Sequence, residues 1–188
     1  MFFEPKTITL KDGRSAILRS PEPDDAAEML GFLRMTASET DFLLRSADEE
    51  LTMTLEGERN YLERAAGSPD NLMICCFVGE DEASRVLAGN CALSFNSRRK
   101  TAHRASIGIA LKKEFWGLGI GTNLMRELDL AARERGVSQL ELEFIEGNNR
   151  ARALYEKSGF RIVGIHPNAF RMSDGSLASE YLMIKELK

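Results

Sequence analysis

The sequence predicts one α/β-type sheet domain, and three observations lead to this prediction. Apolar residues recur at every third or fourth position in some segments, which is typical of amphipathic helices, and at every second position in others, which is typical of strands. The two kinds of segment interleave along the chain. The 188 residues show no linker, internal repeat or low-complexity tract, so residues 1–188 are expected to form a single domain.

The first seventy or so residues are expected to form a hairpin and two helices. Alternating residues flank the turn Lys11-Asp12-Gly13-Arg14, a pattern typical of a β-hairpin. Prolines and acidic residues precede the first apolar helical stripe, and Gly67-Ser68-Pro69-Asp70 ends the second, which are common start and stop signals. The expected bounds are 6–19 for the hairpin and 21–37 and 54–67 for the helices, with 41–51 less regular.

After residue 70 short apolar runs alternate with two helical segments. The longer helical segment places Leu124, Met125 and Leu128 on one side and ends at Gly136, a residue that often follows a helix. The expected strands are 72–78, 86–95, 105–111, 140–145, 160–163 and 181–184; the expected helices are 122–135 and 148–157; a polar turn is expected at 80–84.

Composition and charge exclude several classes of protein. Apolar residues make up 43% and charged residues 29%, which is ordinary for a soluble globular chain and unlike a disordered or fibrous one. No apolar run approaches the ~18 residues of a membrane span, and the start of the chain does not resemble a signal peptide. The 25 basic and 29 acidic residues do not suggest nucleic-acid binding. We therefore expect a cytoplasmic protein without a membrane or nucleic-acid partner.

The three cysteines are expected to be reduced core residues. Cys75 and Cys76 are adjacent in an apolar run, so they should point to opposite faces of a strand, and Cys91 lies in another such run. No spacing of cysteine and histidine suggests a zinc site, so no metal is expected.

A glycine-rich loop between a predicted strand and a predicted helix suggests a phosphate site. Residues 117–121 read Gly-Leu-Gly-Ile-Gly, and a helix follows. Glycines permit close backbone approach, and a helix N-terminus offers free N–H groups to an anion. The segment lacks the lysine of a P-loop, and its glycine spacing does not fit the dinucleotide-binding fingerprint. Nucleotide-dependent phosphotransfer is therefore not expected.

Two segments resemble motifs of the GNAT superfamily of N-acetyltransferases. Gly119 and Gly121 match the glycines of the family's pyrophosphate loop, Gln/Arg-x-x-Gly-x-Gly/Ala, with Trp116 in place of the first residue. Residues 148–160, NNRARALYEKSGF, resemble the family signature N-x-x-A-x-x-L-Y-E-K-x-G-F. The motifs cover about residues 103–165. The resemblance implies an α/β (α+β) GNAT-like acyl-CoA N-acyltransferase fold, a mixed twisted sheet flanked by helices.

The resemblance also implies a coenzyme and its binding residues. Acetyl-CoA would serve as co-substrate, with no metal, and an amine as acceptor. Backbone groups of the strand before the loop would bind pantetheine, the loop would bind pyrophosphate, and an asparagine would contact the pantetheine arm. In this sequence these positions are Ile109, Leu111, Gly117, Leu118, Gly119, Gly121, Thr122 and Asn148.

Catalysis in such a site needs a proton donor for the leaving sulfur and a base for the amine. By the resemblance Tyr155 faces the sulfur, and a tyrosine hydroxyl keeps its proton at neutral pH and can donate it. Ala105 stands where many relatives carry a glutamate, so His103, two residues earlier, is the first candidate base and Glu143 the second. A base acting through ordered water is a third alternative.

The acceptor is expected to be a primary amine of a small molecule or of a protein or peptide. Residues 21–64 hold twelve acidic and four basic residues, and an acidic rim there would attract a cationic amine. No cysteine lies in the predicted site, which favours direct attack in a ternary complex. The alternatives are a longer acyl-CoA donor, or a non-catalytic acyl-CoA-binding sensor or interaction module. The sequence leaves the oligomeric state open, a homodimer among the options.

Overall fold

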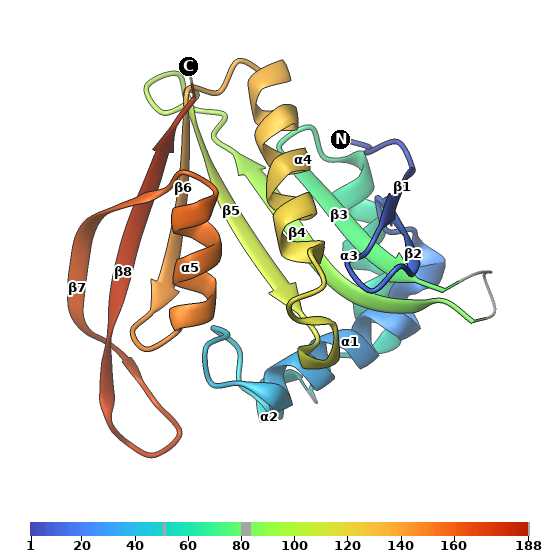
Figure 1. Ribbon diagram of the computed structural model, residues 1–188, viewed down its shortest axis with the longest axis horizontal. Helices are drawn as coiled ribbons and strands as arrows, with labels where there is room; N and C mark the ends of the chain where they lie inside the picture. The colour runs from blue at the N-terminus through green and yellow to red at the C-terminus, as the bar shows by residue number, and fades with distance from the viewer. Residues whose placement is uncertain (51, 80–83, 188) are drawn as a thin grey trace.

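Eight strands form one mixed sheet with helices on both faces in the computed structural model, which describes residues 1–50, 52–79 and 84–187 (Figure 1). The strands lie in the order β1-β2-β3-β4-β5-β6-β8-β7. They are β1 (Lys6–Thr9), β2 (Ser15–Arg19), β3 (Asn71–Val78), β4 (Val86–Phe95), β5 (Arg104–Leu111), β6 (Gln139–Ile145), β7 (Arg161–Arg171) and β8 (Leu177–Glu186). The helices are α1 (Ala26–Glu39), α2 (Ala47–Glu50), α3 (Leu55–Gly67), α4 (Ile120–Glu134) and α5 (Asn149–Lys157), with 3-10 turns η1 (Pro23–Asp25) and η2 (Lys113–Phe115).

The sheet splits between β5 and β6, which run parallel, whereas the other neighbouring strands are antiparallel. These two strands pair only over Arg104–Ser106 and Gln139–Glu141, where both begin. Beyond this point they diverge like the arms of a V, while β5 stays paired with β4 as far as Leu111 (Figure 1). One edge of β5 therefore carries backbone N–H and C=O groups that no strand of the described chain takes up.

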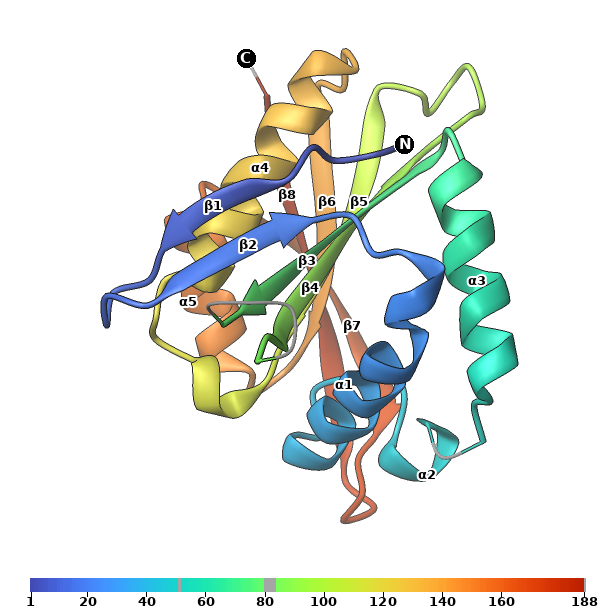
Figure 2. The same cartoon turned by 90° about the vertical axis from the view of Figure 1, so that its right-hand side faces the viewer.

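The two faces of the sheet have separate cores. Helices α4 and α5 cover one face, and α1 and α3 cover the other (Figure 2). Cys76 belongs to the core packed against α4, and Cys75 belongs to the core packed against α1 and α3. The prediction that these adjacent residues point to opposite faces is confirmed. Both thiols and that of Cys91 are free and buried, and burial raises the pKa of Cys76 to about 12.

Most predicted elements occur close to their expected bounds, but the last two strands are much longer than predicted. Expected at 160–163 and 181–184, they extend over Arg161–Arg171 and Leu177–Glu186. The far part of β7 is mostly exposed, so it lacks the alternation of apolar and polar residues that marks a half-buried strand. Its register also shifts between His166 and Phe170, and Asn168 adopts a positive φ of 56°.

The remaining elements differ little from their expected bounds. The long helix begins at Ile120, two residues earlier than expected, and the irregular stretch 41–51 contains α2. Of the polar turn expected at 80–84, residues 80–83 lie outside the described residues. Within the described ranges, the helices are all too short or too polar to cross a membrane.

Candidate active site

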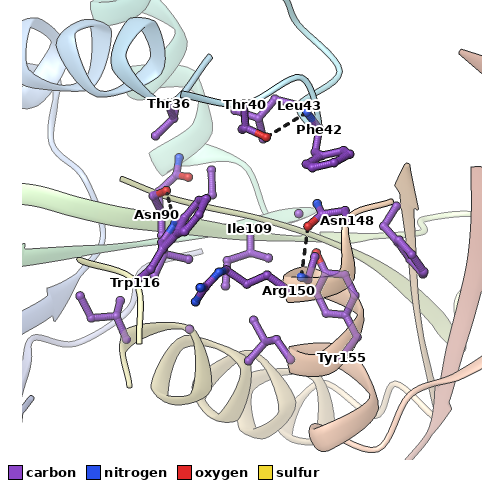
Figure 3. Close-up of a pocket in the computed structure, with 18 of the residues that line it drawn as sticks. Thr36, Thr40, Phe42, Leu43, Asn90, Ile109, Trp116, Asn148, Arg150 and Tyr155 are labelled. Carbon is purple, nitrogen blue, oxygen red and sulfur yellow. Dashed lines mark hydrogen bonds between the residues drawn. The ribbon is translucent and has the colours of Figure 1, made fainter. Parts of the chain in front are cut away.

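A cavity of about 1430 Å³ occupies the gap between β5 and β6 (Figure 3). Its walls come from distant parts of the chain, because the sheet order brings them to the same gap. They include residues from the end of α1 and the loop after it (36–44), the open edge of β5 (107–111), the loop before α4 with the first turn of that helix (115–122), the end of β6 and the turn after it (143–149), and α5 (150–157).

The loop between β5 and α4 presents the start of a helix to this cavity. Gly117 and Gly119 have φ values of 80° and 93°, a left-handed conformation that glycine adopts without steric cost. Gly119 is the N-cap of α4 and has no side chain to cap the helix, so N–H groups of the first turn stay available to a ligand. Thr122, in that first turn, also lines the cavity. Such a helix N-terminus suits a phosphate group.

Gly121 has a packing role that the motif alone does not reveal. A Cβ at this position would lie 3.0 Å from Cδ2 of Leu154 on α5, closer than side chains normally approach. The absence of a side chain therefore lets α5 pack against the start of α4. This contact helps to bring the two helices together at the cavity.

Three cations that were not among the predicted coenzyme-binding residues line the cavity: Lys11, Arg150 and Lys157. The backbone N–H of Lys11 donates to the Leu118 carbonyl at 3.1 Å, which fixes the β1–β2 turn beside the loop. Lys11 is far from the loop in sequence, and only the fold brings the two together. Leu118 itself packs against the core and lies outside the cavity lining, unlike the other predicted coenzyme-binding residues.

The backbone groups of Ile109 and Leu111 face the open gap. The N–H of Lys112 donates to the Ala88 carbonyl on β4 at 3.0 Å. Successive residues of a strand point their backbone N–H and C=O groups to alternate edges. Leu111 and Ile109 therefore present these groups to the edge opposite β4. The Leu111 carbonyl accepts a hydrogen bond from the indole Nε1–H of Trp116 at 3.0 Å, which is consistent with a carbonyl that points away from β4. An extended chain of amides, such as pantetheine, can pair with such an edge.

Asn148 and Tyr155 border the cavity at α5 (Figure 3). Asn148 is the N-cap of α5, and its side-chain oxygen accepts a hydrogen bond from the Ala151 N–H at 3.2 Å. The buried ring of Tyr155 packs against Phe144 and Phe160, with centroids 6.2 and 6.3 Å away. Burial raises the pKa of Tyr155 to about 12, so the hydroxyl keeps its proton at neutral pH and can donate it.

Glu143 lines the cavity from β6. Its side chain lies on the face of the strand opposite to Leu142 and Phe144, because successive side chains alternate. Burial first, and then the negative charges of Glu180 and Glu141, raise the pKa of Glu143 above its ordinary value. A carboxylate with a raised pKa is a stronger proton acceptor at neutral pH.

His103 lies outside the cavity, at the other end of β5. It precedes the strand, and its backbone carbonyl accepts hydrogen bonds from the N–H groups of Ser138 and Gln139, where β5 and β6 are paired. The prediction placed the base two residues before Ala105, but Ala105 is itself buried where β5 and β6 pair, and the part of β5 that lines the cavity starts at Ile107. The exposed His103 side chain is therefore not positioned to act in the gap, and this candidate base is withdrawn.

The acidic residues of the first helices are not all free to form a rim. The Asp25 carboxylate pairs with Arg19, Glu28 accepts the Leu87 N–H, and Asp24 pairs with Arg59. Of the twelve acids, the cavity lining includes Glu39, whose carboxylate accepts the Lys113 N–H at 2.7 Å. Several acidic residues of this segment therefore form ion pairs and hydrogen bonds within the fold, and Glu39 lies at the cavity.

Comparisons with known proteins agree on one family. A sequence model of the acetyltransferase (GNAT) family matches residues 38–160. The [ribosomal protein bS18]-alanine N-acetyltransferase of Haemophilus influenzae is 37% identical over 100 residues, which are 53% of this chain and 68% of that protein. The acetyltransferase of the GNAT family from Streptococcus pneumoniae has a similar structure, with a TM-score of 0.80 and 28% identity over 91% of this chain and 99% of that one. The yncA protein of Salmonella typhimurium, solved with its cofactor acetyl-CoA, shares the fold, with a TM-score of 0.74 and 15% identity over 91% and 93% of the two chains.

Proposed function

This chain belongs to the GNAT acetyltransferase family, and we propose that it transfers an acetyl group from acetyl-CoA to a primary amine by direct attack in a ternary complex. The observation that carries the proposal is the continuity of one cavity. It joins the uncapped helix start at Gly119 to Tyr155 on α5 and to Glu143 on β6. An anion site, a proton donor and a proton acceptor thus line the same space.

The coenzyme would lie along the gap with its phosphates at the start of α4. N–H groups of that first turn would bind the pyrophosphate, and the charges of Lys11, Arg150 and Lys157 favour an anion nearby. The open edges of Ile109 and Leu111 would pair with the pantetheine amides. This arrangement directs the thioester away from the loop and towards Tyr155.

The amine must lose a proton before it attacks, and Glu143 is the proposed acceptor of that proton. Because the pKa of Glu143 is raised, it lies closer to neutral pH, and the carboxylate accepts a proton more readily there. The amine nitrogen then forms a bond to the carbonyl carbon of the thioester. A backbone N–H of the β5 edge, at Leu111, would stabilise the oxyanion that develops.

The tetrahedral intermediate collapses when the carbon–sulfur bond breaks. The electron pair of that bond moves to sulfur, which takes the hydroxyl proton of Tyr155. As the amide forms, the nitrogen loses its second proton, which returns to the tyrosine oxygen, while Glu143 releases the first proton to solvent. With its pKa at about 12 the hydroxyl stays protonated over the working pH range, so it is available as a donor when charge develops on sulfur. The products are the acetylated amine and free CoA thiol.

The acceptor belongs to the class of primary amines on small molecules, peptides or proteins. The Haemophilus influenzae relative is named for a ribosomal protein alanine, which is a protein amine. A protein N-terminus is therefore one member of the class to be tested, beside simple alkylamines and polyamines.

The test is acetyl-CoA turnover against a panel of such amines, in which release of the CoA thiol is measured. We expect at least one amine to raise thiol release well above hydrolysis in its absence, with one acetylated amine formed per thiol. A protein that binds CoA in calorimetry but acetylates no amine in the panel would instead be a sensor, and the proposal would fail.

A further inference from the structure

A second cavity of about 150 Å³ adjoins the main one at Glu143. We call it the side chamber; its apolar lining includes Phe42, Leu44, Ile145 and Phe170, and its carboxylates are those of Glu143 and Glu180. Phe42, Leu44 and Glu143 line the main cavity as well, so the two spaces share a wall. A group bound beside Glu143 can therefore extend into the side chamber.

The two carboxylates belong to neighbouring strands and share one face of the sheet. In the antiparallel pairing of β6 with β8, Ile145 lies opposite Glu180 and Glu143 lies opposite Leu182. Glu143 and Glu180 are therefore diagonal neighbours, a relationship in which long side chains reach one another. On the outer side of Glu180, Nδ1 of the exposed His166 lies 3.7 Å from its Oε2.

The apolar wall is held in place by contacts between distant segments. Phe42 packs against the turn after β6, where a Cβ on Gly147 would lie 3.5 Å from its ring. Asp41, the residue before it, accepts a hydrogen bond from the hydroxyl of Ser173 in the β7–β8 turn. The loop after α1 and the β7–β8 ribbon therefore close around the chamber together.

We propose that the side chamber selects the acceptor: it takes an apolar group of about the size of a benzene ring, attached one or two carbons from the reacting ammonium, while Glu180 and Glu143 together bind that ammonium. A cavity of about 150 Å³ has room for a benzene ring. Two neighbouring carboxylates favour a cation between them. The inference rests on the proposed function for the identity of the reacting group, and it narrows the class of primary amine.

Ligand binding tests the chamber without relying on turnover. Calorimetry with the CoA-loaded protein would compare benzylamine with benzyl alcohol, its neutral analogue. We expect Phe170→Ala to weaken both ligands by about tenfold, because the ring loses apolar contact. We expect Glu180→Gln to weaken benzylamine by about fivefold or more and benzyl alcohol by less than about twofold, because only the charge changes.

Two further variants guard against effects on folding. Leu44 is 83% exposed, so Leu44→Ala should fold normally and weaken both ligands in the same direction as Phe170→Ala. Val163, exposed on β7 outside the chamber, supplies the matched control Val163→Ala, which should bind as the parent does. Parental affinity for benzylamine in both Leu44→Ala and a folded Phe170→Ala would overturn the proposal.

Steady-state rates separate this inference from the proposed function. We expect the parent to acetylate benzylamine with a kcat/KM at least about tenfold above that for ethylamine, and Phe170→Ala to remove the difference. Equal kcat/KM values for the two amines in the parent would overturn the chamber's selective role while leaving acetyl transfer intact. Benzylamine that binds to the parent and binds weakly to Phe170→Ala, in a protein that acetylates no amine of the panel, would support the chamber and refute the proposed function.

Discussion

The guanidinium of Arg150 lies over the indole ring of Trp116, with its central carbon 4.6 Å from the ring centroid, so that α5 contacts the loop before α4 across the cavity (Figure 3). Trp116 stands where the family motif has glutamine or arginine, and Arg150 lies just after the N-cap of α5. A positive charge is thus brought to the end of the cavity where α4 begins. The pair also supplies a fluorescence signal, because Trp116 is the one tryptophan of the chain.

The first prediction uses that signal. Titration with CoA should change the fluorescence of Trp116, and the change should saturate as the site fills. The reason is that phosphate would compete with the indole ring for Arg150. Arg150→Ala should weaken CoA binding by about tenfold through the loss of a charged contact. Arg152→Ala is the matched control on the same helix, because Arg152 pairs with Glu156 outside the cavity. Equal affinity of Arg150→Ala and the parent would remove Arg150 from the coenzyme site.

The second prediction concerns the backbone of the loop. Gly119→Asp should weaken acetyl-CoA binding by at least about 100-fold, because it places a side chain at a φ of 93° and a negative charge beside phosphate. Gly136→Asp is the control: its φ of 76° imposes a similar strain at the far end of α4, with open space around it. Calorimetric titration of both folded variants decides the matter. Similar losses in the two would attribute the effect to strain rather than to the site.

The local motifs were predictable from the sequence, whereas contacts between distant segments were not. Gly119 and Tyr155 lie in short segments whose spacing identifies them. Lys11 and Glu180 reach the cavities only through the order of strands in the sheet, which no single segment encodes. His103 was assigned to the site by its place before Ala105, but the gap between β5 and β6 opens only beyond Ser106, a divergence that no local pattern encodes. Strand alternation put Cys75 and Cys76 on their correct faces, since both lie within a strand.

The third prediction concerns the base. Glu143→Gln should lower kcat/KM by about 10²–10⁴-fold, the usual scale for a general base. Burial and the charges of Glu180 and Glu141 raise the pKa of Glu143, so the parent's rate should fall as the pH drops through a value above the ordinary glutamate range. Glu180→Gln removes one of these charges and should move that acid limb to lower pH. A pH–rate profile of Glu143→Gln that keeps the parent's acid limb would assign it to another group.

The fourth prediction tests stability away from the cavity. The buried Asp25 receives two hydrogen bonds of 2.7 Å from Arg19, whose guanidinium also lies 4.1 Å from the ring centroid of Phe77. Burial alone would raise the pKa of Asp25, but the hydrogen bonds and charges of its partners outweigh burial and lower it. Asp25→Asn should therefore reduce the free energy of unfolding at neutral pH by about 3 kcal/mol, the scale for breaking a buried ion pair.

The pH dependence of that loss follows from the sign of the shift. A carboxylate with a lowered folded-state pKa stabilises the fold above its unfolded pKa, and this contribution disappears as the pH falls through the folded value. The difference between parent and Asp25→Asn in urea unfolding should thus stay constant from pH 7 down to the unfolded carboxyl pKa of about 4 and shrink below it. The exposed pair Asp24–Arg59 gives the control Asp24→Asn, which should change stability by less than about 0.5 kcal/mol. A deficit in Asp25→Asn that also stays constant below the unfolded carboxyl pKa would contradict the ionic origin.

The last prediction concerns Tyr155 and follows from the timing of charge on sulfur. Tyr155→Phe removes one hydroxyl and keeps a ring that packs against Phe144 and Phe160. Because negative charge builds on sulfur only as the carbon–sulfur bond breaks, the loss should lower kcat by at least about tenfold. Acetyl-CoA affinity should change by less than about 1 kcal/mol, the scale of one neutral hydrogen bond. Tyr181→Phe is the control, since Tyr181 stacks on Phe144 at 5.2 Å and should keep the parent's kcat. Single-turnover rates at saturating acetyl-CoA isolate the chemical step. If Tyr155→Phe kept the parent's rates across the pH range, the hydroxyl would have no acid role, and the ring would serve the core alone.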